Sequence, residues 1–167
     1  MFTRGVRFWP PMTILACIVA LSVLSVGGLD RATAASAEDG VVKVKSAYGL
    51  DETIMRVKQD VADKGIMFFQ QIDQAKLAAD ADIMLRPSTL LIFGNPPLGS
   101  LFMTANPYAG LDWPVRLLVV EDESGQVWLA YTDFDYIKRR HQIDSRDEAF
   151  KMASTVIASI ASSVQAK

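Results

Sequence analysis

Two strand-forming runs joined by a short acidic loop set the strongest constraint on the fold. Residues 115–120 and 127–131 are rich in Val, Leu and aromatic side chains, and the glycine-containing loop 121–126 separates them. Two such runs on either side of a short loop are typical of a β-hairpin. The hairpin therefore predicts that antiparallel strands form part of the fold.

The other segments alternate between strand and helix patterns. Residues 41–47 alternate apolar and basic side chains, which indicates a strand with one solvated face. A helix is predicted at 51–64, where apolar residues recur on one face. The resulting order, β-α-β-α-β-(α)-β-β-α-α, predicts a single α+β domain with one mixed or antiparallel sheet flanked by helices. Further strands are expected at 66–72 and 89–93, and further helices at 73–81, 101–105, 133–140 and 145–164.

Short polar side chains indicate where these helices begin. Asp51, Asp73 and Asp133 each precede a helical pattern and are predicted N-caps. Residues 145–148 have the S-x-x-E spacing of a capping box. The stretch 94–100, Gly-Asn-Pro-Pro-Leu-Gly-Ser, is predicted to be a loop because Gly, Pro and Asn favour turns.

The segment 89–93, Thr-Leu-Leu-Ile-Phe, is nearly all apolar. Such a run is typical of a strand covered on both faces. A small domain has few elements to supply two covering layers, so a homodimer interface is one interpretation. Six other large apolar residues are interpreted as core, with an apolar ligand pocket as the alternative: Met67, Phe68, Phe69, Leu101, Phe102 and Met103.

The first 37 residues resemble a secretory signal peptide. Two arginines precede an uncharged stretch at 12–29, and small-x-small cleavage sites follow at 32–37. We predict cleavage after Ala37 and export of residues 38–167 to the periplasm or the exterior. An uncleaved membrane anchor at 12–29 and a lipoprotein attached through Cys17 are the alternatives.

Charge and cysteine content exclude several kinds of function for residues 38–167. This part of the chain has 14 basic and 18 acidic residues, a net charge of −4. A mildly acidic domain lacks the basic face that nucleic-acid binding requires. The single cysteine lies before residue 38, so we expect no disulfide, thiol nucleophile or cysteine-ligated metal in the domain.

The spacing Gly94-x-x-x-x-Gly99-Ser100 is similar to that of a phosphate-binding P-loop. The lysine that would reach the phosphates is absent, and Pro96 and Pro97 remove two backbone N–H donors. The segment is therefore interpreted as a turn and not as a nucleotide site.

Two charged residues have both a structural and a functional interpretation. His141 is the only histidine and has no paired metal-ligand spacing, so we interpret it as a structural group near a helix C-terminus. Arg116 interrupts an apolar strand and needs a partner, for which Asp112, Glu121 and Asp133 are the candidates. The alternative partner for Arg116 is a ligand that carries a carboxylate or phosphate.

Several motifs together resemble the domain of unknown function 302, a bacterial family. They are Ile72-Asp73, Leu-Arg-Pro-Ser-Thr-Leu-Leu-Ile-Phe-Gly-Asn-Pro at 85–96, Leu-Asp-Trp-Pro-Val-Arg at 111–116 and Val-Trp-Leu-Ala-Tyr at 127–131. The likeness extends over about residues 46–143, with the C-terminal helix outside it. It implies a compact α+β domain that is often dimeric, and no established activity.

The resemblance also indicates polar positions that could form a site. They are Arg86, Asn95, Arg116, Tyr131 and His141. Gln74 stands where the family pattern commonly has a histidine. A neutral amide replaces a metal- or haem-binding imidazole poorly, which argues against a two-histidine site.

The function predicted from these features is an exported, non-catalytic domain that binds a small molecule or a protein partner. A homodimer and a small apolar or anionic ligand are the expected partners, and no cofactor or metal is expected. The alternative is an enzyme, or a redox- or metal-associated accessory protein, with a pocket around Arg86, Arg116, Tyr131 and His141.

Overall fold

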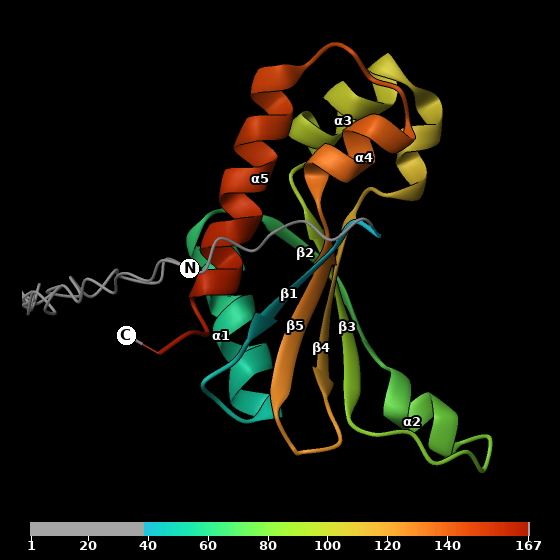
Figure 1. Ribbon diagram of the computed structural model, residues 1–167, viewed down its shortest axis with the longest axis vertical. Coiled ribbons are helices and arrows are strands. Elements are labelled where there is room, and N and C mark those ends of the chain that lie inside the picture. The colour runs from blue at the N-terminus through green and yellow to red at the C-terminus, as the bar shows by residue number, and fades with distance from the viewer. Residues whose placement is uncertain (1–38, 167) are drawn as a thin grey trace, which may run out of the picture. The chain divides into compact units, whose positions relative to one another are not determined.

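The computed structural model describes residues 39–166 and shows one five-stranded antiparallel sheet with helices (Figure 1). The predicted α+β class and element order are confirmed, and every strand pair is antiparallel. The strands follow the order β1-β5-β4-β3-β2 across the sheet. The strands are β1 (Val41–Lys45), β2 (Met67–Asp73), β3 (Ser88–Gly94), β4 (Val115–Glu121) and β5 (Val127–Thr132). The helices are α1 (Leu50–Asp63), α2 (Gln74–Ala79), α3 (Pro96–Ala105), the 3-10 helix η1 (Pro107–Leu111), α4 (Phe134–Arg140) and α5 (Asp147–Ser162).

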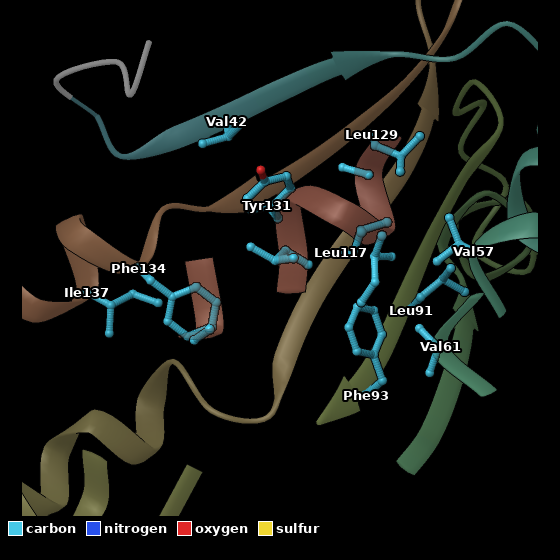
Figure 2. Close-up of a cluster of buried hydrophobic side chains, with 14 of the residues drawn as sticks. Val42, Val57, Val61, Leu91, Phe93, Leu117, Leu129, Tyr131, Phe134 and Ile137 are labelled. Atoms are coloured by element: carbon cyan, nitrogen blue, oxygen red, sulfur yellow. The ribbon is translucent and has the colours of Figure 1, made fainter. Parts of the chain in front are cut away.

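Helices α1 and α5 cover one side of the sheet, which we call the inner face (Figure 1). Val57 and Val61 of α1 are fully buried and lie near Leu91 of β3 (Figure 2). Helix α5 contributes Phe150 and Ile160 to the same core, both almost fully buried. Burial of this much apolar surface supplies the main stabilising free energy of the domain.

The opposite side of the sheet, the outer face, carries no helical layer within residues 39–166 (Figure 1). The alternation of side chains along each strand places one apolar set on this face. These side chains are only half-buried. In β3, Leu91 and Phe93 are buried, whereas Leu90 and Ile92 are only half-buried. The expectation that the strand at 89–93 is covered on both faces is therefore wrong. The apolar residues of the outer face on the three central strands are Leu90, Ile92, Leu118, Val120, Trp128 and Ala130.

Residues 74–87, which we call the arm, connect β2 to β3 and contain the short helix α2 (Figure 1). The arm is poorly buried, and the side chain of Met84 is fully exposed. Leu77, Ile83 and Leu85 are each more than half exposed. An exposed apolar set of this kind on a folded domain is typical of an interaction surface.

Strand β2 lies at one edge of the sheet and contains an irregularity. The register between β2 and β3 shifts between Phe68 and Gln70, so one residue of β2 is left without a partner. Such a bulge bends the strand and increases its local twist.

Three predicted helix starts differ from the observed ones. Helix α1 begins at Leu50 after Gly49, and Asp51 lies in its first turn, where a negative charge favours the helix dipole. Helix α3 begins at Pro96, because Asn95 caps it and proline is tolerated in the first turn. Helix α5 follows Arg146, which has a left-handed φ of 71° and makes no side-chain cap, so the predicted capping box is absent.

Candidate functional site

A buried carboxylate, Asp112, holds together the end of the sheet where α4 and η1 meet. Its Oδ2 lies 2.6 Å from Nε2 of His141, and both side chains are at least 95% buried. Its Oδ1 accepts from Nη1 of Arg140 at 3.2 Å and from Nη2 of Arg116 at 3.4 Å. Of the three partners considered for Arg116, Asp112 is therefore the one it contacts.

Further hydrogen bonds hold these groups in place. The side chain of Asn106 donates to the backbone carbonyl of His141 at 2.8 Å. The guanidinium of Arg116 also donates to the carbonyl of Leu111. His141 is the C-cap of α4, with its backbone N–H donating to Ile137. In this cluster one buried carboxylate accepts from two half-exposed guanidinium groups and orients them.

The described residues do not assemble a nucleophile or a metal site around this cluster. A histidine–aspartate pair can orient a general base, but covalent catalysis of the triad type also needs a hydroxyl or thiol within reach of the imidazole. Within residues 39–166, the His141 ring forms a hydrogen bond with Asp112 and with no hydroxyl or thiol group. The same residues contain no group of three His, Cys, Asp or Glu side chains that could hold a metal ion.

Two of the residues singled out in the sequence lie elsewhere. Arg86 is more than half exposed and pairs with Glu123 at 3.2 Å. Arg116 of β4 pairs with Ile92 of β3, and Ile92 follows Arg86 by six residues. Because an extended chain rises by about 3.3 Å per residue, the two arginines are about 20 Å apart along the strand direction. Tyr131 lies on the inner face, where it is part of the buried core, and burial raises the pKa of its hydroxyl, with a further contribution from Asp133 (Figure 2).

The structure therefore brings Arg116 and His141 together through Asp112 and leaves Arg86 and Tyr131 apart from them. Two members of the cluster were not among the predicted site positions: Asp112, which organises it, and Arg140, which donates to Asp112. The sequence does contain a signal for the contact between Asp112 and Arg116, because the two residues are four positions apart.

Asn95 lies beside a small apolar cavity between β3, α3 and α5. The cavity has a volume of about 40 Å³, and its lining includes Phe93, Leu98, Trp113 and Ile157. The side-chain oxygen of Asn95 accepts from the backbone N–H of Leu98 at 3.1 Å, so it caps α3. Pockets for metabolite-sized ligands are roughly 300–1,000 Å³. This cavity therefore has room only for a molecule of a few atoms.

A wider groove lies where the arm meets the outer face. It has a volume of about 610 Å³ and is open to solvent. Its apolar lining comes from Met84 and Leu85 of the arm and from Val120 of β4. The groove joins the exposed apolar residues of the arm to those of the outer face, so the two form one continuous surface.

No helix within residues 39–166 has the length and apolar character needed to cross a membrane. The model of the family described as "Domain of unknown function DUF302" matches residues 42–160. A solved structure, an uncharacterized conserved protein DUF302 from Bacillus stearothermophilus, matches with a TM-score of 0.69 and 16% identity. The match covers 75% of this chain and 98% of that one, which shows that the two share a fold.

Two similar relatives carry names that refer to a channel. The chain is 38% identical over 119 residues to a protein from Brucella suis named "Fluoride-specific ion channel FluC 1", covering 71% of this chain and 47% of that protein. The same identity relates it to "Fluoride-specific ion channel FluC 2" from Brucella melitensis, with 44% of that protein covered. The chain thus spans less than half the length of these relatives.

Proposed function

The chain belongs to the DUF302 family, and we propose that it is an exported, non-catalytic interaction domain that forms a homodimer through its outer face. The observation that carries the proposal is the uncovered apolar surface of the sheet, which continues into the groove beside the arm. Exposed apolar patches of this kind on a small domain are typical of protein interfaces.

The size of the surface favours an interface that includes the arm. Five strands about 4.8 Å apart and about six residues long cover roughly 500 Å². Stable interfaces bury roughly 800 Å² on each partner. The sheet alone falls short of this area, and the exposed residues Leu77, Ile83, Met84 and Leu85 of the arm add further apolar surface to it.

Charge complementarity supports a second copy as the occupant and favours one orientation of it. Lys43 and Lys45 project from β1 on the outer face, because they alternate with Val42, which is buried in the core, and Val44, which packs against it. The arm carries Asp80 and Asp82 in exposed positions, and Asp80 pairs with Lys76 of the arm at 3.1 Å. The pairings Lys45–Trp128, Trp128–Val120 and Val120–Ser88 place Lys45 level with the base of the arm, at the opposite edge of the sheet.

In a dimer whose outer faces meet, a two-fold axis parallel to the strands places the β1 edge of one sheet over the β2 edge of the other. The same ends of the two sheets then lie together. Such an axis lays the arm of each copy over the β1 edge of its partner, so Asp82 faces Lys43 of the partner subunit and Lys45 of the partner subunit. This is the self-complementary arrangement that a two-fold interface requires. An axis perpendicular to the strands would instead place the arm over the other end of the sheet.

The test is the oligomeric state of the protein purified after expression of the full chain. We expect a dimer by sedimentation equilibrium at micromolar concentration and a monomer for Leu118→Asp, which puts a charge in the middle of the outer face. Met55→Asp is the matched control, because Met55 is a large exposed residue of α1 away from that face. A wild-type protein that is monomeric at this concentration would overturn the proposal.

Export is tested separately by mass spectrometry of the protein isolated from the producing cells. We expect the first residue to be Glu38. A chain that retains residues 12–29 and sediments with membranes would contradict export by cleavage and favour a membrane anchor.

A second candidate function comes from the relatives named as fluoride channels. The domain would act beside an anion channel of the membrane without forming the pore itself. The test is fluoride release from loaded cells that contain or lack the chain. Equal release rates in the two strains would remove this candidate.

A further inference from the structure

We propose that the homodimer binds a small dianionic oxyanion on its two-fold axis, between the Arg116 and Arg140 side chains of its two copies. This inference rests on the proposed homodimer. The interface does not explain Arg116, which places a half-exposed positive charge among the apolar outward side chains of the central strands.

The position of Arg116 in the sheet determines what it meets in the dimer. Strand β4 is the middle strand of the five, so an axis parallel to the strands passes over it when the two outer faces overlap. Each outward residue of β4 then faces its own counterpart. Leu118 meets Leu118 of the partner subunit, and Arg116 meets Arg116 of the partner subunit.

Two facing sheets lie about 10 Å apart, which is within the combined reach of two arginine side chains. Like charges directly opposite each other are destabilising, and more so where apolar side chains exclude water. The two guanidinium groups therefore need a common counter-ion.

The carboxylate within each copy does not supply enough negative charge. Arg116 and Arg140 share a single oxygen of Asp112, with N–O distances of 3.4 and 3.2 Å. Two fixed positive charges and one carboxylate leave one excess positive charge per copy, and hence two in the dimer. A dianion matches this excess.

The geometry also prepares the arginines to bind an anion. Each guanidinium has five N–H donors. Arg116 uses one nitrogen for Asp112 and the carbonyl of Leu111, and Arg140 uses one nitrogen for Asp112. Both side chains remain about half exposed, so other donors face the solvent. Arginine forks held in this way bind phosphate or carboxylate oxygens in pairs.

The experiment is calorimetric titration of the dimer with inorganic phosphate at pH 8, where the dianion dominates, against sodium chloride of equal ionic strength. We expect one phosphate per dimer and a dimer dissociation constant at least about tenfold lower in phosphate than in chloride. Arg116→Gln should abolish phosphate binding and leave a dimer that is insensitive to phosphate. Arg56→Gln is the matched control, because Arg56 is an exposed arginine of α1 paired with Glu52.

The outcomes separate this inference from the proposed function. One phosphate per chain, or equal affinity in the monomeric Leu118→Asp variant, would show a site within a single copy and overturn the shared site while the dimer stands. A dimer whose stability is the same in phosphate and chloride, or phosphate heat unchanged in Arg116→Gln, would show an adventitious ion only. A wild-type monomer would overturn both proposals.

Discussion

His141 and Asp112 form a buried hydrogen-bonded pair, with Nε2 of the histidine 2.6 Å from Oδ2 of the aspartate. The pair joins the C-terminal end of α4 to the turn that follows η1. Because the same carboxylate also accepts from Arg140 and Arg116, one side chain ties the segment 112–116 to the end of α4, which is distant in the sequence. The integrity of this end of the molecule depends on Asp112.

Replacing Asp112 should therefore destabilise the fold. Asp112→Ala removes the acceptor of three side chains and leaves polar groups unpaired, which costs about 3 kcal/mol in the free energy of unfolding. Urea unfolding followed by circular dichroism measures the change. Glu52→Ala, which breaks an exposed ion pair with Arg56, is the control and should cost less than about 1 kcal/mol. A loss below about 1 kcal/mol for Asp112→Ala would show that the cluster is not structural.

The loop of the β4–β5 hairpin should make stability depend on pH. The Ser124 hydroxyl and the Trp128 indole N–H donate to Asp122 and, with backbone N–H groups of Gln126 and Ser124, lower its pKa from 3.8 to about 2. A carboxyl group with a depressed folded-state pKa stabilises the fold above its unfolded pKa. This contribution is lost as the pH falls from about 4 to about 2.

Carbon-13 NMR of the side-chain carboxyl groups tests this directly, and the Asp122 resonance should titrate with a midpoint near pH 2. Asp122→Asn should remove the corresponding part of the acid destabilisation. Glu123→Gln changes an exposed carboxylate in the same loop and is the matched control. A midpoint for Asp122 near pH 4 would contradict the hydrogen-bonded geometry.

The close approach of Trp113 to α3 should make Gly99 intolerant of a side chain. A Cβ atom at Gly99 would overlap the Trp113 indole ring, so either the ring or the helix has to move. We expect Gly99→Ala to cost about 2 kcal/mol in the free energy of unfolding and to shift the tryptophan fluorescence spectrum. Gly110→Ala is the control, because its Cβ would lie 3.5 Å from Met103, an ordinary contact distance. Equal stability of the two variants would contradict this packing.

Asn95 should act as a helix cap. Asn95→Ala removes the acceptor for the Leu98 N–H and should lower the free energy of unfolding by about 1 kcal/mol. Asn95→Ser keeps a capping oxygen and should restore most of this loss. If both substitutions destabilise equally, the amide has a role that capping does not explain.

The sequence predicted the parts of the fold that depend on neighbouring residues. Asp73 and Asp133 cap α2 and α4 as expected, because a capping side chain acts on N–H groups two or three residues away. The predicted start of α3 is wrong, because proline is tolerated in the first turn of a helix and Asn95 caps that turn, so Pro96 and Pro97 begin a helix here and do not form a loop.

The candidate site depends on distant residues, and this part could not be predicted. Asp112 and His141 are separated by 29 positions, and their contact follows from how η1 and α4 meet at the end of the sheet. The separation of Arg86 from Arg116 likewise follows from the β3–β4 register. Neither relationship has a local signature, since both are set by the packing of whole elements.

The bulge in β2 has a consequence for assembly. An edge strand with unpaired N–H and C=O groups can recruit a further strand and extend the sheet into a filament. The register shift at Phe68 and Gln70 disrupts the regular ladder at one edge, and Lys43 and Lys45 place positive charges at the other. Both edges therefore resist strand addition, and growth of the sheet from chain to chain is discouraged. Association is directed to the flat face, where a closed pair uses up the available surface.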